Sequence, residues 1–214
     1  MILVFLGAPG AGKGTQAKIL EDRYGMRQIS TGDILRRHRA DKTPLGVEAQ
    51  GYMDSGKLVP DNLIIRMMEQ ELAKSGDIIL DGFPRTIPQA EAFGALLAQK
   101  GTAAKAVVFD ADPSALGNRL SGRWSNPRTG RVYHTTFAPP AVAGIDDEDG
   151  GPLVQRPDDK VEVVKQRLAQ YEEKTAPLIG YYERLGNAVH VDALGPIDIV
   201  TAKIIAAAGL DNAA

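Results

Sequence analysis

A glycine-rich segment near the N-terminus, residues 7–15, has the residue types needed to bind phosphate. Its glycines let backbone N–H groups approach a phosphate chain that a Cβ would keep away. Lys13 adds a positive charge, and the helix expected to start there adds the field of its N-terminal end. The strict pattern has Ser or Thr directly after the lysine, whereas here Gly14 intervenes and Thr15 follows. The segment therefore predicts nucleoside phosphate binding, but on its own it names no reaction.

Basic side chains that could neutralise several phosphates recur along the chain. Arginine suits this task because its planar guanidinium holds two phosphate oxygens at once and stays charged. Arg85 follows a predicted strand, a position that favours function by itself. Arg119 and Arg167 lie on predicted helices, where an arginine is more often solvated, so spacing alone leaves their roles open. The basic candidates are Lys13, Arg36, Arg85, Arg119, Arg123, Arg156 and Arg167.

Three aspartates are candidates for binding a magnesium ion through its water molecules or for pairing with these basic side chains. Asp81 ends a predicted buried strand and could hold the water molecules of a magnesium ion, with a turn or helix cap as the alternative. Asp158 and Asp159 could pair with arginines, or they could cap and begin a helix. Both roles remain open for this pair.

Short apolar runs that alternate with helical patterns position these residues. Residues 1–6, 78–80 and 106–109 are typical of strands buried on both faces of a parallel sheet, and 188–191 and 28–29 are weaker copies. The alternation predicts an α/β fold in three layers, with a five-stranded parallel sheet flanked by helices and the site at the carboxyl ends of the strands. The helical patterns lie at 13–24, 62–72, 88–98, 114–120, 158–171 and 197–208.

Two segments do not fit this alternation. Residues 30–59 are helical and polar, whereas residues 122–159 are rich in Gly, Pro and Asp and contain short β-like pieces near 131–133. A structureless loop of that length is unusual in a compact domain, so both segments are predicted to be inserted subdomains that could move. The predicted core domain consists of residues 1–29, 60–121 and 160–214. The first segment has predicted glycine breaks at Gly32, Gly46, Gly51 and Gly56.

Composition limits the classes of function. The chain has 214 residues, 43% of them apolar, and a formal net charge of −2, so it has no global attraction to nucleic acid or anionic membranes. It contains no cysteine, which excludes disulfides, thiolate zinc sites and cysteine nucleophiles. We expect a cytoplasmic protein that binds neither nucleic acid nor membranes.

Several motifs in collinear order resemble those of the adenylate kinases. The resemblance covers nearly the whole chain and implies a P-loop NTPase-type fold, with an NMP-binding subdomain at 30–59 and a lid at 122–159. It implies the reaction ATP + AMP ⇌ 2 ADP with Mg²⁺ bound to ATP, a role in adenine nucleotide homeostasis, and a monomer whose only partners are ATP, AMP and ADP. The matching motifs are residues 7–17, 28–33, 80–86, 130–134, 139–140, 156–159 and 175–182.

The same resemblance implies roles for individual residues. For ATP it implies Gly10, Ala11, Gly12, Lys13, Gly14, Thr15, Arg119, Arg123, Val132, Tyr133 and Gly195, the last through its backbone carbonyl because family members often have a lysine there. For AMP it implies Thr31, Arg36, Lys57, Leu58, Val59, Gly82, Phe83, Pro84, Arg85 and Gln89. Arg156 and Arg167 are implied near both phosphate groups, and the catalytic set is Lys13, Arg85, Arg119, Arg123, Arg156, Arg167, Asp158 and Asp159.

The lid departs from the form in which four cysteines hold zinc. Polar residues stand at the matching positions, which predicts a hydrogen-bonded network and no structural zinc. Trp124 stands where a second arginine is common, and it could either pack within the lid or touch the donor base. The polar residues are Asn126, Thr129, Asp146 and Asp149.

Three other functions compete with this interpretation. One of them, nucleic acid binding, is disfavoured by the net charge and by the lack of a basic stripe with aromatic residues. A UMP or CMP kinase of the same fold normally has a short lid, which the long segment 122–159 argues against. A non-enzymatic nucleotide-binding switch would need neither so many cations nor a second nucleotide subdomain. The sequence therefore favours an adenylate kinase.

Overall fold

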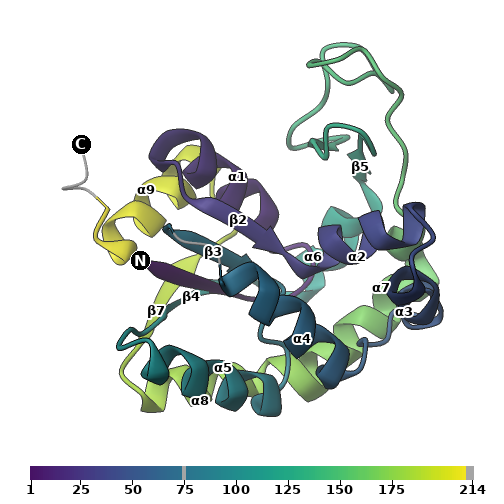
Figure 1. Ribbon diagram of the computed structural model, residues 1–214. Coiled ribbons are helices and arrows are strands. Elements are labelled where there is room, and N and C mark those ends of the chain that lie inside the picture. The colour runs from purple at the N-terminus through teal and green to yellow at the C-terminus, as the bar shows by residue number, and fades with distance from the viewer. Residues whose placement is uncertain (74–75, 211–214) are drawn as a thin grey trace.

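A five-stranded parallel sheet forms the centre of the protein, as the computed structural model shows for residues 1–73 and 76–210 (Figure 1). Its strands are β1 (Ile2–Leu6), β2 (Arg27–Ser30), β3 (Ile78–Asp81), β4 (Lys105–Asp110) and β7 (Ala188–Asp192). They lie in the order β2-β3-β1-β4-β7, and every neighbouring pair is parallel. The predicted sheet is confirmed, including its two weaker strands.

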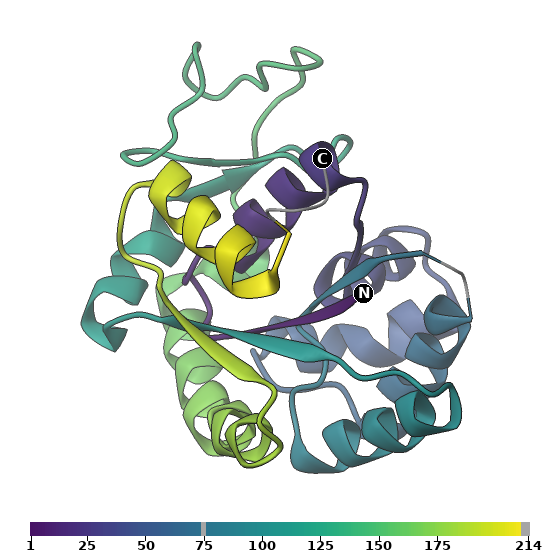
Figure 2. The same cartoon turned by 90° about the vertical axis from the view of Figure 1, so that its left-hand side faces the viewer.

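Helices cover both faces of the sheet and form the outer layers (Figure 2). Along β1, Val4 and Leu6 pack into one apolar cluster with α4 (Asp61–Leu72), α5 (Ile87–Gln99) and α8 (Pro177–Arg184). Leu3 and Phe5 pack into the other cluster with α1 (Lys13–Tyr24) and α9 (Ile197–Ala208). Burial on both sides explains why β1 is a continuous apolar run. Among residues 1–73 and 76–210, no helix is both long and apolar enough to cross a bilayer. The helices are α1 (Lys13–Tyr24), α2 (Thr31–Ala40), α3 (Pro44–Asp54), α4 (Asp61–Leu72), α5 (Ile87–Gln99), α6 (Pro113–Ser121), α7 (Val161–Gln170), α8 (Pro177–Arg184) and α9 (Ile197–Ala208).

The helix predicted at 158–171 is interrupted, and α8 was not predicted at all. A 3₁₀ turn, Pro157–Asp159, precedes α7, and a π-helical turn, Tyr171–Thr175, joins α7 to α8. Ala176 N donates to Tyr171 O at 2.8 Å, which is the wider spacing of a π turn. Pro177 follows directly and has no N–H to donate, so the chain passes from one helix to the next without a regular α-helical turn.

Three of the four predicted glycine breaks are wrong, because Gly32, Gly46 and Gly51 lie inside α2 and α3. Gly46 allows the two helices to approach closely, since a Cβ there would overlap the backbone of α2. The break between the helices falls instead around Lys42, which adopts a left-handed conformation with φ of 50°. Gly56, with φ of 69°, does follow the end of α3 as predicted.

The segment 122–159 contains no regular helix before Pro157, as the sequence indicates. Its two short strands, β5 (Arg123–Ser125) and β6 (Val132–His134), pair antiparallel, and Ser125 also pairs with Val154 across the segment. Figure 1 shows the long connection after β6 extending away from the central sheet. The predicted β-like piece at 131–133 is therefore confirmed to within a residue.

A histidine lies between two carboxylates where β4, β7 and α8 meet. His190 Nδ1 lies 3.1 Å from both carboxylate oxygens of Asp110, and Nε2 lies 3.0 Å from Glu183 Oε1. The hydrogen bond to Asp110 raises the pKa of His190, burial opposes this, and the bond to Glu183 raises it further. The folded state therefore favours the protonated ring.

We expect His190 to make stability depend on pH. A raised pKa stabilises the fold fully below the unfolded value of about 6.5, and the contribution is lost as pH rises through the folded pKa. Because the ring is partly exposed, His190→Gln should cost about 0.2–1 kcal/mol at pH 5 and progressively less at higher pH. Denaturant unfolding from pH 5 to 9 measures this difference. His38→Gln is the control, because His38 bonds the Thr43 hydroxyl instead of a carboxylate; a difference for His190→Gln that stayed constant with pH would contradict the account.

Candidate phosphate-binding site

The loop between β1 and α1 is shaped by glycines. A Cβ on Gly7 would lie 2.8 Å from Phe109 Cβ, so the loop passes directly against β4. Gly10 and Gly12 adopt φ of 89° and 94°, a left-handed region that favours glycine. Gly12 is the N-cap of α1, and no side chain caps that helix end. The N–H groups of its first turn therefore point toward a site suited to an anion.

Lys13 lies over this loop. Its Nζ donates to Gly7 O at 2.7 Å and to Ala8 O at 2.9 Å. Burial lowers the pKa of Lys13 to about 8, and the nearby charges of Arg85, Arg167 and Arg123 lower it further against the opposing effect of Asp81. The surroundings of Lys13 therefore disfavour its positive charge, mainly because they exclude water.

Asp81 lies beside the first turn of α1, at the edge where the strands end. The sheet register pairs it with Phe5 on one side and Ser30 on the other. A Cβ on Gly14 would lie 3.4 Å from Asp81 Oδ2, so the carboxylate faces the position where the strict motif has a hydroxyl residue. Thr15 is exposed one residue later.

The segment after β3 brings Arg85 back toward the loop. Arg85 Nε and Thr31 Oγ1 both donate to Gly82 O at 2.8 Å, which links this turn to the start of α2. Gly82 has a φ of 82°, a left-handed conformation that favours glycine. Burial lowers the pKa of Arg85, as does the charge of Arg167. Phe83 is buried in the core, and the Phe83–Pro84 peptide is cis.

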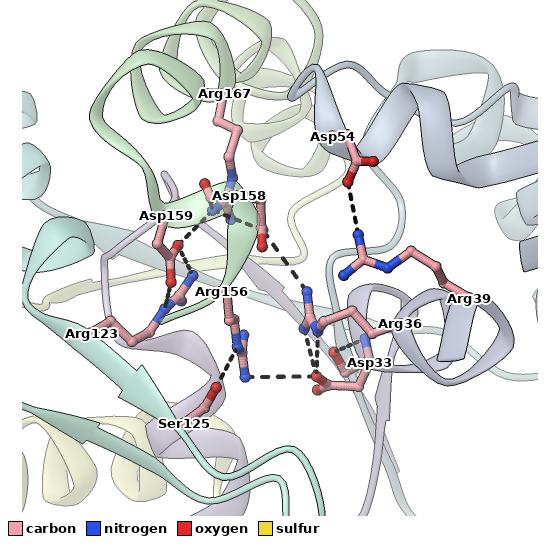
Figure 3. A network of polar contacts seen from close by, with 11 residues as sticks. Asp33, Arg36, Arg39, Asp54, Arg123, Ser125, Arg156, Asp158, Asp159 and Arg167 are labelled. Atoms are coloured by element: carbon pink, nitrogen blue, oxygen red, sulfur yellow. Dashed lines mark hydrogen bonds and ion pairs between the residues drawn. The ribbon is translucent and has the colours of Figure 1, made fainter. Parts of the chain in front are cut away.

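Two arginines share the carboxylates at the end of the lid segment (Figure 3). Arg123 donates through Nε and Nη2 to the two oxygens of Asp159, which is fully buried. Arg167 Nη1 donates to Asp159 Oδ1 at 2.9 Å and to Asp158 O at 2.9 Å. Burial opposes the charge on Arg123, but its bond to Asp159 leaves the pKa raised. Arg167 Nη1 also lies 3.0 Å from Asp158 Oδ2, so both aspartates pair with arginines, which is one of the two roles left open for them.

A second set of contacts joins the segments 30–59 and 122–159 (Figure 3). Arg36 donates through Nε and Nη2 to Asp33 Oδ1, and its Nη1 lies 4.0 Å from Asp158 Oδ2. Arg156 lies 3.8 Å from the same Asp33 oxygen and donates from Nε to Ser125 Oγ at 3.2 Å. Burial lowers the pKa of Arg156 to about 10, and the charges of Arg36 and Arg123 contribute.

Asp33 was not among the predicted site residues. It accepts from Arg36 and lies near Arg156, and these two arginines lower its pKa although burial raises it. One sequence signal was available, because Asp33 precedes Arg36 by three residues on a predicted helical segment. Its proximity to Arg156 depends on the tertiary fold.

Arg119 lies apart from the other predicted cations. Its Nη1 donates to Ala193 O at 3.2 Å, two residues before Gly195, and its guanidinium lies 5.1 Å from the ring centroid of Phe137. Phe137 is 58% exposed and its ring centroid lies 4.5 Å from that of His134. Arg119 thus bridges the loop after β7 and an aromatic pair of the lid that was not predicted.

Tyr133 and Gln89, both predicted to contact a nucleotide base, have side chains that hydrogen-bond to other groups of the protein. Tyr133 is 5% exposed; its hydroxyl donates to Asp146 and accepts from Asp147 N at 2.8 Å, so its ring is not free to flank a base. Gln89 is 1% exposed, donates from Nε2 to Asp61 Oδ1 at 2.7 Å and accepts at Oε1 from Arg85 N at 2.8 Å. Its amide retains one further N–H and one further lone pair.

The three residues predicted to contact AMP between α3 and α4 differ in exposure. Lys57 is exposed, Leu58 is half-buried and Val59 lies in the core. Just before them, a Cβ on Gly56 would lie 3.1 Å from Val163 of α7, so this connection packs closely against the helix that carries Arg167.

The four polar residues of the lid form the predicted hydrogen-bonded network. Asn126 Nδ2 and Thr129 Oγ1 both donate to Asp146 Oδ2, and Asn126 also donates to Asp149 Oδ1 at 2.7 Å. Burial raises the pKa of Asp146, but the hydrogen bonds from Tyr133, Thr129 and Asn126 outweigh it and leave the pKa well below its usual range. Trp124, 37% exposed, lies opposite Tyr133 in the β5–β6 pair.

The fold and this site define the class of the protein. A strand, a glycine loop and a helix that begins at a lysine, with arginines gathered around them, form a phosphate-binding α/β protein of the P-loop kind. A family model described as adenylate kinase matches residues 5–187, and the chain belongs to the adenylate kinase family.

Relatives named adenylate kinase are similar to this protein over nearly the full chain. An adenylate kinase of Citrifermentans bemidjiense is 51% identical over 97% of this chain and 99% of its own length. An adenylate kinase of Geobacter sp. (strain M21) is 50% identical with the same coverage. Adenylate kinase 4 of Oryza sativa subsp. japonica is 45% identical over 94% of this chain and 85% of its own length.

We expect Asp146→Asn to loosen the lid. The substitution replaces one acceptor oxygen with a donor that faces the donors of Tyr133, Thr129 or Asn126, and it removes the negative charge that strengthens these bonds. Amide hydrogen exchange in residues 142–151 should become about tenfold faster, while exchange in β1 should not change. Glu148→Gln is the matched control, because Glu148 is exposed and lies 3.8 Å from Arg131. Equal exchange in both variants would show that Asp146 does not hold the lid together.

Proposed function

We propose that this chain transfers the terminal phosphoryl group of ATP to AMP and thereby forms two molecules of ADP. Phosphoryl transfer between two nucleotides brings many negative charges together and requires positioning and neutralisation more than covalent chemistry. The observation that carries the proposal is the cluster of half-buried cations beside the glycine loop. Lys13, Arg85, Arg123, Arg156 and Arg167 come from separate parts of the chain and influence one another electrostatically.

We assign ATP to the glycine loop. The backbone N–H groups of residues 10–15 and the side chain of Lys13 would hold its phosphates, because the uncapped start of α1 favours an anion. Arg123 would join them from the lid. Arg119, the backbone of residues 132–133 and the carbonyl of Gly195 would hold the base, an assignment supported by the contact of Arg119 with the loop after β7.

We assign AMP to the opposite side, between α2 and the segment after β3. Arg36 and Arg85 would hold its phosphate, and Arg156 and Arg167 would reach both phosphate groups. Thr31, residues 57–59, residues 82–84 and the free donor and acceptor of Gln89 would surround the nucleoside. The contact between Thr31 and the Arg85 segment supports this grouping.

Asp81 fits the magnesium ion that such a reaction uses. Magnesium is usually bound through one or two carboxylates together with substrate phosphates and water. The Asp81 carboxylate lies beside the first turn of α1, where the phosphates of ATP would end. When bound, the ion would neutralise phosphate charge, and Asp81 would hold its water molecules.

We infer that three parts of the chain divide the work. The core, residues 1–29, 60–121 and 160–214, would carry the glycine loop, whereas residues 30–59 would bind AMP and residues 122–159 would close as a lid. The contacts Arg36–Asp158 and Arg156–Asp33 support this division, because they join the two segments through charges and can exchange for contacts with phosphate. Asp158 and Asp159 would orient the arginines during that exchange.

We further infer that the protein acts on free nucleotides as a cytoplasmic monomer and helps to keep the adenine nucleotides in balance. The near-neutral net charge supports the absence of a nucleic acid or membrane partner. The UMP or CMP kinase alternative is disfavoured by the long segment 122–159.

A coupled assay of ADP formation tests the proposed function. We expect ATP with AMP to give the fastest turnover among AMP, UMP, CMP and GMP, because the relatives that match the full chain are adenylate kinases. Lys13→Ala is the control for contaminating kinases and should lose about 100-fold, the usual loss when one preorganised charge-stabilising donor is removed. Faster turnover with UMP or CMP than with AMP would overturn the proposal.

A further inference from the structure

The backbone of Arg85 is held on both sides by side chains from different elements. Its N–H donates to Gln89 Oε1 at 2.8 Å, and its carbonyl accepts from Thr175 Oγ1 at 2.9 Å. Its own Nε donates to Gly82 O at 2.8 Å. An arginine placed in a loop with both backbone groups and one side-chain nitrogen fixed loses little freedom when it binds a ligand.

Gln89, which accepts from the Arg85 N–H, is itself held by hydrogen bonds. Gln89 Nε2 donates to Asp61 Oδ1 at 2.7 Å, and Thr86 Oγ1 donates to Asp61 Oδ2 at 3.0 Å. Asp61 begins α4, while Gln89 lies in the first turn of α5, so two helices fix the Arg85 N–H. An amide held by a carboxylate at one end and a backbone N–H at the other has a defined orientation.

The carbonyl side depends on Thr175 alone among the contacts found for the described residues. Thr175 ends the π-helical turn, and α7 before that turn carries Arg167. Within a helix a threonine hydroxyl commonly bonds a carbonyl of its own preceding turn. Here it donates instead to Arg85 O, ninety positions away in the sequence. The π turn therefore links the helix of Arg167 to the loop of Arg85.

This link opposes a repulsion. After burial, the charge of Arg167 is the next effect that lowers the pKa of Arg85, so the charge of Arg167 disfavours the charge on Arg85. Like charges at close range push their segments apart unless the backbone is held. The hydrogen bond from Thr175 joins the backbones of these two segments.

We propose that Thr175 is a positioning residue that sets Arg85 relative to Arg167 by holding the Arg85 carbonyl. This inference rests on the proposed function in one respect, that Arg85 binds the phosphate of AMP. Thr175 itself does not contact the nucleotide. Its loss would let the Arg85 loop move away from Arg167 and weaken the AMP site, while leaving the ATP site on the glycine loop intact.

Thr175→Val tests this, because valine keeps the size of threonine and removes only the hydroxyl donor. We expect the KM for AMP to rise about fivefold to tenfold, the usual effect of one lost hydrogen bond, and the KM for ATP to stay within about twofold. Thr175→Ser keeps the donor and should restore the KM for AMP. Thr102→Val is the matched control on the surface, since Thr102 is exposed. Thermal melting of each variant checks that it is folded.

A double-mutant cycle with Arg85→Ala separates positioning from a general structural effect. If Thr175 acts through Arg85, adding Thr175→Val to Arg85→Ala should change the KM for AMP by less than about twofold. A full additive loss, an equal rise in both KM values, or failure of Thr175→Ser to recover would each overturn the positioning role. If the wild-type chain phosphorylates AMP while Thr175→Val retains its KM, this inference fails alone; if the wild-type chain does not phosphorylate AMP, the proposed function fails.

Discussion

Positive charges held close together in half-buried surroundings are the constraint on which the rest of this structure depends. Lys13, Arg85, Arg156 and Arg167 lie in surroundings that lower the pKa of each, with burial as the main cause. Like charges in partly desolvated surroundings repel one another, so such a cluster is stable only where carboxylates or a ligand offset it. Asp33, Asp81, Asp158 and Asp159 supply the offset, and they are placed at the ends of strands and at segment junctions.

The parallel sheet provides the rigid part of this arrangement. Because all five strands run in one direction, the glycine loop after β1 and Asp81 at the end of β3 reach the same edge. Apolar packing on both faces fixes these two elements. The contacts from Arg36 and Arg156 are of a different kind, since they are ion pairs that phosphate oxygens can replace. Apolar packing thus holds the glycine loop and Asp81, whereas ion pairs hold Arg36 and Arg156.

Features of the fold that are set by residues close in the sequence could be predicted, whereas features set by residues distant in the sequence could not. Strands buried on both faces appear in the sequence as apolar runs, so β1, β3 and β4 were evident, and α1 and α9 were predicted with their observed bounds. Gly46 was misread as a helix break because it permits a close approach between α2 and α3. The π turn and α8 were not predicted, because Pro177 has no N–H for a regular helical hydrogen bond and the turn before it is wider than an α-helical one.

The same reasoning applies to the site. Lys13 and Arg85 could be singled out from local motifs, and the lid network followed from the polar residues at its four positions. Asp33, Asp61 and Phe137 were not predicted, because each acts through partners distant in the sequence. The engagement of Gln89 with Asp61 could not be foreseen for the same reason. Local motifs therefore indicate candidate site residues, whereas the residues that hydrogen-bond to them are known only from the tertiary fold.

We expect the surroundings of Lys13 to disfavour its positive charge until a polyphosphate binds. A ¹⁵N NMR titration of the Lys13 side chain, assigned by comparison with Lys13→Arg, tests this most directly. The account predicts a pKa of about 8 in the free protein. It also predicts a rise toward the ordinary lysine value of about 10.4 when an ATP analogue is bound. A Lys13 pKa near 10.4 in the free protein, unchanged by the analogue, would contradict it.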